Sequence, residues 1–258
     1  MDVSFSRPPA MFGPFHLGML AGIALVCVLV FLIIRRWRER ALLRLIFILG
    51  VGMVLMEVWK QWFVWNYVYV HERNLWFFPW QLCSMAMYCC LLLPYLKRKH
   101  QDAVLVFLAT FSLLAALMAL AVPADMLRPQ ILLTLHGFIY HGLMLVESLT
   151  AAIIIGKRGK ASFTPAVMLF IIMAAIAEMI NVAGHYLMHD IHREPDMFFI
   201  TPYYPTTQPF FDRIAASLGI LPEILLYLLA TITASWLLYL IGRGTGSEKR
   251  QSTDQRLS

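Results

Sequence analysis

One cysteine near the start of an apolar stretch is the best-placed nucleophile in this sequence. Cys83 follows the run Trp76-Phe77-Phe78-Pro79-Trp80, and such aromatic residues are typical of the interface between a membrane and water. A cysteine in an apolar helix is most often an inert packing residue, because burial disfavours the thiolate. Cys83 differs in its setting, since it lies close to the expected start of a helix, where the positive end of the helix dipole favours a thiolate.

A histidine on a second apolar stretch is a candidate base for that thiol. His141 lies about eight to twelve residues after the expected start of its helix, so its depth matches that of Cys83. A histidine can remove the thiol proton, and the thiolate can then attack an ester carbonyl. The simpler alternative is a packing histidine that is hydrogen-bonded within the membrane.

Further polar side chains inside the apolar stretches are candidates for the wall of a substrate site, because polar groups are costly in a membrane. Glu57, Lys60 and Gln61 share one face of a helical turn, and an ion pair that joins helices is their simpler explanation. Asn181 and His185 lie on one stripe of a later helix. The predicted substrate-binding residues are Glu57, Gln61, Gln81, Asn181 and His185.

Three histidines form a weaker pattern. His185, His189 and His192 stand at i, i+4 and i+7 and would share one helical face, as ligands of a metal would. No HExxH motif or second histidine cluster accompanies them. We therefore expect neither a metal nor another cofactor.

The composition indicates an integral membrane protein. Hydrophobic residues make up 60% of the 258 residues and charged residues 14%, whereas soluble domains are roughly 45–50% apolar. The net charge of +6 comes from residues at the ends of apolar stretches, without the basic stripe of nucleic-acid-binding proteins. Membrane lipids are the expected partners, nucleic acid is not, and the oligomeric state stays open.

Seven stretches are long enough to cross a membrane, since a spanning helix needs ~20 apolar residues. The predicted fold is an all-α polytopic helix bundle that forms a single domain over residues 1–243. A Pro- and aromatic-rich extracytoplasmic cap is expected at 189–220, and a polar, disordered cytoplasmic tail at 244–258. The expected helices cover about 15–34, 42–69, 76–96, 103–122, 129–155, 163–188 and 221–241.

Basic residues predict the orientation of this bundle. Lys and Arg cluster after the first, third, fifth and seventh stretches, and basic loops stay on the cytoplasmic side. The N-terminus is therefore expected outside and the C-terminus in the cytoplasm. The predicted location is the cell membrane as a multi-pass protein, with a bacterial cytoplasmic membrane favoured.

Several short motifs resemble one known family, the YwaF-type multi-spanning membrane proteins. That family is related to a vertebrate transmembrane protein that acts as a Cys-dependent phospholipid acyltransferase. The resemblance implies that Cys83 is the nucleophile and His141 its partner. Many members of the family carry a histidine at the position of Gln81, and this chain does not. The motifs are Pro79 to Cys83, Phe138-Ile139-Tyr140-His141-Gly142, Asn181, Phe198-Phe199-Ile200 and Leu221-Pro222.

The predicted function is acyl transfer on phospholipids by a Cys83–His141 dyad, with transfer and hydrolysis both open. Gln61, Gln81 or Asn181 would then donate to the oxyanion. The alternative is a non-enzymatic carrier or sensor that binds a small polar ligand in an outward-facing cavity. Its ligand would contact the polar residues Glu57, Lys60, Glu178, Asn181 and His185.

Overall fold

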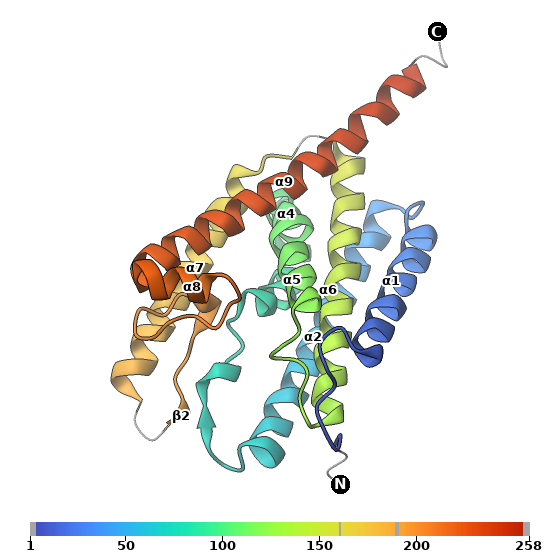
Figure 1. The fold of residues 1–258 in the computed structure, drawn as a ribbon. Helices are drawn as coiled ribbons and strands as arrows, with labels where there is room; N and C mark the ends of the chain where they lie inside the picture. Colours follow the sequence, from blue (N-terminus) through green and yellow to red (C-terminus); the bar gives the residue numbers. More distant parts are fainter. Residues whose placement is uncertain (1–3, 160, 189–190, 255–258) are drawn as a thin grey trace.

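The described part of the chain forms seven helical spans in a computed structural model. Figure 1 shows how these spans are arranged. The structure describes residues 4–159, 161–188 and 191–254. Each span is long and apolar enough to cross a membrane, which confirms the predicted all-α polytopic fold. The spans are Pro14–Ile34, Glu39–Val68, Leu75–Tyr95, Arg98–Ala121, Ile131–Arg158, Thr164–Leu187 and Ile220–Arg243.

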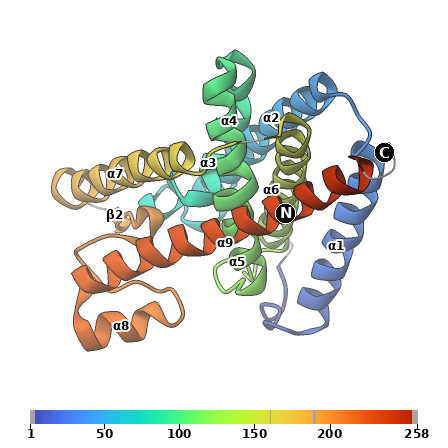
Figure 2. The same cartoon turned by 90° about the horizontal axis from the view of Figure 1, so that it is seen from above.

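Helix α6 (Ile131–Arg158) is the central element of the bundle. It contacts α1 (Pro14–Ile34), α2 (Glu39–Phe63) and α5 (Leu113–Ala121). Helix α1 and helix α7 (Thr164–Leu187) lie on opposite sides of α6 in both views (Figures 1 and 2). Many side chains of α6 are therefore buried between helices, although Ile139 is half exposed, whereas much of α1 faces outward.

The third span is a broken helix rather than the continuous helix expected over 76–96. Two short 3₁₀ turns, η2 (Leu75–Phe77) and η3 (Leu82–Ser84), precede α3 (Met85–Leu92), and a further turn, η4 (Leu93–Tyr95), ends the span. Pro79 has no N–H to continue a helix, and the backbone around it is extended at Phe78 (ψ 133°) and Gln81 (ψ 159°). Cys83 consequently lies in a turn directly before α3.

Side chains satisfy the carbonyl groups that this break exposes. Gln61 donates to the Phe77 carbonyl oxygen, and the Tyr88 hydroxyl donates to the Pro79 carbonyl oxygen at 2.9 Å. Irregular backbone at membrane depth is tolerated only where protein groups bind it in this way.

Two other spans contain π-helical turns, which widen a helix locally. Helix α2 continues into η1 (Val64–Val68), and η5 (Leu108–Ser112) joins α4 (Arg98–Phe107) to α5. The Phe111 ring of η5 stacks on Phe170 of α7, with ring centroids 4.7 Å apart. This contact lies in the main hydrophobic core of the bundle.

The connection between α7 and α9 (Ile220–Asp254) folds back against the helices. Strand β2 (Ile191–Arg193) pairs in parallel with β1 (Arg73–Asn74), and the segment then makes η6 (Met197–Phe199) and α8 (Phe211–Leu218). Met197 and Phe198 are fully buried. The connection is thus mostly buried over residues 195–201, whereas Phe210 and Leu218 are more than half exposed. The extracytoplasmic location of the expected cap stays a prediction, and residues 189–190 lie outside the described part.

Helix α9 runs to Asp254, beyond the expected end of the last helix at 241. The side chains after Arg243 lie outside the described part of the chain. The predicted polar tail at 244–258 therefore stays a prediction.

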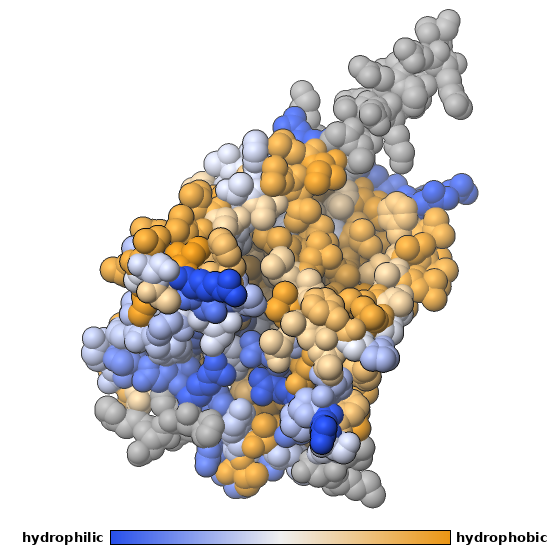
Figure 3. Space-filling model, in the orientation of Figure 1, coloured by the Kyte–Doolittle hydropathy of each residue, from blue (hydrophilic) through white to orange (hydrophobic). Residues whose placement is uncertain are grey.

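The surface separates into apolar and polar regions (Figure 3). Hydrophobic residues cover most of the upper part of the visible face, and hydrophilic residues gather at its lower end, where β2 lies in Figure 1. Large hydrophobic side chains such as Leu25, Ile33, Leu225 and Leu229 are more than half exposed on α1 and α9. Such a surface is stable in lipid rather than in water.

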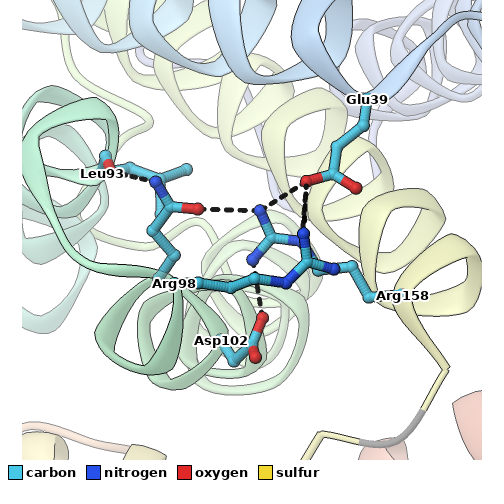
Figure 4. Close-up of polar contacts among 6 residues, drawn as sticks. Glu39, Leu93, Arg98, Asp102 and Arg158 are labelled. Atoms are coloured by element: carbon cyan, nitrogen blue, oxygen red, sulfur yellow. Dashed lines mark hydrogen bonds and ion pairs between the residues drawn. The ribbon is translucent and has the colours of Figure 1, made fainter.

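At the other end of the bundle, one arginine joins three helices (Figure 4). Arg158 of α6 has a side chain only 3% exposed, and its guanidinium binds Glu39 of α2 at 2.7 Å and Asp102 of α4 at 2.6 Å. It also donates to Gln101 at 2.7 Å. An arginine that is hydrogen-bonded on several sides in this way fixes the relative positions of the helices that carry its partners.

Candidate functional site

The break in the third span and the middle of α6 bring the predicted nucleophile and base together. The Cys83 Sγ atom lies 3.3 Å from Nε2 of His141. Both side chains are partly buried. His141 is ten residues after Ile131, or about 15 Å along α6 from its first residue. The two residues are 58 positions apart in sequence, so only the tertiary fold creates this contact.

The hydrogen bond at Nδ1 of His141 determines whether Nε2 can accept a proton. Nδ1 lies 2.7 Å from the Gly137 carbonyl oxygen, which can only accept a hydrogen bond. Nδ1 therefore carries the proton in the neutral ring, and Nε2 is left as an acceptor that faces the thiol. This is the arrangement that a histidine base needs.

A charged cluster on α2 lies beside this pair. Lys60 Nζ is 2.8 Å from Glu57, and the Gln61 amide donates to the same carboxylate at 2.7 Å. The simpler explanation expected an ion pair that joins helices; the pair is present, but both of its residues lie on α2. The Lys60 Nζ atom also lies 5.9 Å from the centroid of the Phe77 ring, so this charged cluster faces the broken third span that carries Cys83.

Gln81 and Asn181 bind the backbone of the α7–α9 connection. The Gln81 amide donates to the Asp196 carbonyl oxygen at 2.8 Å and accepts from the Phe198 N–H at 3.0 Å. Asn181 likewise accepts from the Met197 N–H at 2.7 Å and donates to its carbonyl oxygen at 3.2 Å. We call this pair of amides and the segment 196–198 the loop clamp. The two amides that were predicted to bind substrate therefore bind the protein's own backbone in this structure.

His185 lies in different surroundings from the Cys83–His141 pair. Its Nδ1 is 2.9 Å from a Glu194 carboxylate oxygen, and its ring stacks on Tyr203 with centroids 3.7 Å apart. His189, the middle residue of the histidine pattern, lies outside the described residues. Within the described residues, no group of three or more His, Cys, Asp or Glu side chains is placed to hold a metal ion.

Asp196 is a residue of this region that sequence reasoning missed. It is 1% exposed, and its Oδ1 accepts from the Thr201 N–H at 3.2 Å. Burial raises the pKa of the Asp196 carboxyl to about 7, against the lowering effects of that hydrogen bond and of Arg193. Its position in a Pro- and aromatic-rich connection gives no sequence signal of burial.

A shallow recess on the surface of α7 is separate from this chemistry. It has a volume of about 410 Å³ and is lined by Glu178, Met179, Val182, Ala183, Tyr186 and Leu187. All six residues belong to one helix, and neither Cys83 nor His141 contributes to the recess.

Comparison with known families gives one match. The TMEM164 family matches residues 11–240, which include Cys83, His141 and the loop clamp. The chain belongs to the TMEM164 family. The TMEM164 assignment agrees with seven membrane spans but names no reaction, and the predicted YwaF-type membership stays a prediction. No curated protein and no solved structure matches the chain.

Proposed function

We propose that this TMEM164-family protein is a membrane-embedded enzyme that transfers acyl chains on phospholipids through Cys83 and His141. The observation that carries the proposal is the 3.3 Å contact between Cys83 Sγ and His141 Nε2, with Nδ1 bound to the Gly137 carbonyl oxygen. A thiol next to an oriented, unprotonated histidine nitrogen is the minimum that nucleophilic catalysis by cysteine requires.

The chemical steps follow from that contact. His141 Nε2 takes the thiol proton, and the Cys83 sulfur attacks the ester carbonyl carbon, whose π electrons move to the carbonyl oxygen. When the C–O ester bond breaks, the lysolipid alkoxide leaves with the proton from His141, and the acyl chain stays on sulfur as a thioester. A lysolipid hydroxyl then attacks the thioester with the same histidine as base, which restores the thiol.

Two features of the surroundings favour the thiolate. The Lys60 ammonium faces the third span, with Nζ 5.9 Å from the Phe77 ring centroid, and a cation on this side opposes the cost of burying a thiolate. Cys83 also lies at the N-terminal end of the helical run 82–95, where the helix dipole is positive. The sequence resemblance to a Cys-dependent phospholipid acyltransferase adds independent support.

The position of Cys83 within a membrane span supports a lipid substrate. The buried residues Met197 and Phe198 next to Gln81 limit water at the site, which favours transfer to a lysolipid over hydrolysis. With the N-terminus outside, as the basic residues predict, the substrate would belong to the outer leaflet of a cell membrane, and a bacterial cytoplasmic membrane is our proposed location.

The alternative function, a carrier or sensor, would require the polar side chains to share one cavity. Glu57 and Lys60 instead pair with each other near His141, Asn181 binds Met197, and His185 binds Glu194. No observation on the described residues favours the alternative over acyl transfer.

The test is direct detection of the acyl-enzyme. Purified protein in phosphatidylcholine vesicles would be given a lysophospholipid acceptor, and Cys83 would be examined by mass spectrometry. We expect a hydroxylamine-sensitive acyl group on Cys83, and we expect the lysophospholipid acceptor to be converted to phospholipid. Both should be lost in Cys83→Ala. Cys89→Ala, which removes a buried thiol from the same membrane span, should retain both. Unchanged acyl transfer by a folded Cys83→Ala protein would overturn the proposal.

A further inference from the structure

The Tyr140 hydroxyl is a buried polar group that the mechanism above does not use. Tyr140 is 5% exposed, and its hydroxyl oxygen has no hydrogen-bond partner in the described structure. Buried hydroxyl groups are nearly always hydrogen-bonded, because a buried unpaired donor is costly. The Tyr88 hydroxyl, by contrast, donates to Pro79. The unpaired phenol therefore points to a partner that the protein itself does not supply.

Tyr140 lies at the Cys83–His141 pair. It directly precedes His141 on α6, and the two rings meet edge to face with centroids 5.8 Å apart. On its other side the Tyr140 ring stacks on His136, also at 5.8 Å, which holds the ring in place. The Tyr140 ring therefore adjoins the ring of the histidine whose Nε2 contacts the Cys83 sulfur.

The donors predicted from sequence are already engaged. Gln81 and Asn181 form the loop clamp, and the Gln61 amide donates to Glu57 and to the Phe77 carbonyl oxygen. An oxyanion requires a donor that is free before the reaction and fixed in position. Among the side chains described around Cys83, the Tyr140 hydroxyl meets both conditions.

We propose that Tyr140 is a catalytic residue, whose hydroxyl donates a hydrogen bond to the substrate carbonyl oxygen during acyl transfer. As the C–S bond forms, the carbonyl π electrons become a lone pair on oxygen, and Tyr140 stabilises that charge without giving up its proton. The hydrogen bond weakens again when the C–O ester bond breaks and the carbonyl re-forms. This inference rests on the proposed function, and it identifies the ligand of this hydroxyl as an ester or thioester carbonyl.

The experiment compares two tyrosine variants of the full chain in phosphatidylcholine vesicles with a lysophospholipid acceptor. Tyr140→Phe keeps the ring and removes only the oxygen. Tyr239→Phe is the matched control, since it removes a hydroxyl that donates to the Ala161 carbonyl oxygen, far from Cys83 in the sequence and on another helix. Three quantities would be measured: kcat, KM and the rate at which methyl methanethiosulfonate labels Cys83.

Loss of an oxyanion donor lowers kcat by about 100-fold or more. We expect that loss in Tyr140→Phe, with KM and the Cys83 labelling rate unchanged, and kcat within about twofold of wild type in Tyr239→Phe. An unchanged kcat in Tyr140→Phe would overturn the assignment, and so would a parallel fall in the labelling rate, which would mean that Tyr140 positions the thiol. If wild-type protein forms no acyl-Cys83 at all, the proposed function itself fails, and this assignment fails with it.

Discussion

At the scale of single residues, the acyl transfer proposed for Cys83 depends on a backbone carbonyl four residues before His141. The Gly137 carbonyl oxygen fixes the proton on Nδ1, and so leaves Nε2 free to accept the thiol proton. Gly137 itself lies against Met126, whose side-chain atoms would be 3.1 Å from an added Cβ. The turn of α6 between Gly137 and His141 is therefore packed against the segment that carries Met126.

His141→Gln tests the role of the base without lipid chemistry. We expect methyl methanethiosulfonate to label Cys83 at least about 10-fold more slowly at neutral pH, because a general base typically contributes more than that factor to its reaction. His136→Gln is the matched control on the same helix, since the His136 ring binds the Met56 carbonyl oxygen and not the thiol. Equal slowing in both variants would assign the effect to helix packing.

At the scale of elements, the loop clamp joins three segments that are far apart in sequence. Gln81 precedes α3, Asn181 lies on α7, and both bind residues 196–198. Gly184 permits this approach, because an added Cβ would lie 2.3 Å from a Pro195 side-chain atom. Residues 196–198, the proposed cover of the site, are therefore held by hydrogen bonds between their main chain and two side-chain amides.

Removing both amides should loosen that cover. We expect Gln81→Leu with Asn181→Leu to raise the hydrolysis-to-transfer ratio and to speed labelling of Cys83 by a water-soluble reagent about 10-fold. Four backbone hydrogen bonds are lost, and each unpaired buried group costs about 1–3 kcal/mol. Asn66→Leu removes an amide that binds only its own helix and should leave both quantities unchanged. A doubly substituted protein with wild-type product ratios would rule out the covering role.

Asp196 predicts how the stability of this region depends on pH. Its folded pKa of about 7 lies above the unfolded value of about 4, so the folded state binds more protons between those values. Stability should therefore fall as pH rises from 5 to 8, by about 2 kcal/mol. Thermal unfolding in detergent across that range measures the effect. Asp196→Asn keeps an acceptor for the Thr201 N–H and should flatten the slope, and an equally steep slope would exclude Asp196 as its source.

The sequence predicted structural elements better where a local run of residues determines them than where they depend on side chains from another span. Seven spans followed from apolar length, whereas the expected pairing of Cys83 with His141 rested on their matching depth together with the family resemblance. The break at Phe78–Gln81 was missed because the groups that stabilise it, such as Gln61, come from another span. Tyr140 was missed for a related reason, since a tyrosine in an apolar helix suggests packing until its unpaired hydroxyl is seen.

At the scale of the whole molecule, Arg158 holds one end of the bundle together. We expect Arg158→Met to lower the free energy of unfolding by about 2–3 kcal/mol, because Glu39 and Asp102 lose their common partner. Arg98→Met is the matched control: its side chain is 63% exposed and 3.6 Å from Glu39, so its loss should cost less than about 1 kcal/mol. Thermal unfolding in detergent compares the two, and equal losses would contradict a special role for Arg158.

The broken third span also constrains how the protein is assembled during synthesis. Its hydropathy of 1.4 is the lowest of the seven spans, and the backbone around Pro79 would be exposed to lipid if the span inserted alone. Gln61, which binds the Phe77 carbonyl oxygen, is synthesised before the third span. The backbone partners of Gln81 follow it by 115 and 117 residues and are synthesised much later. The hydrogen bonds between Gln81 and this segment can therefore form only after the sixth span has entered the bilayer, so the surroundings of the proposed nucleophile Cys83 are completed late in biogenesis.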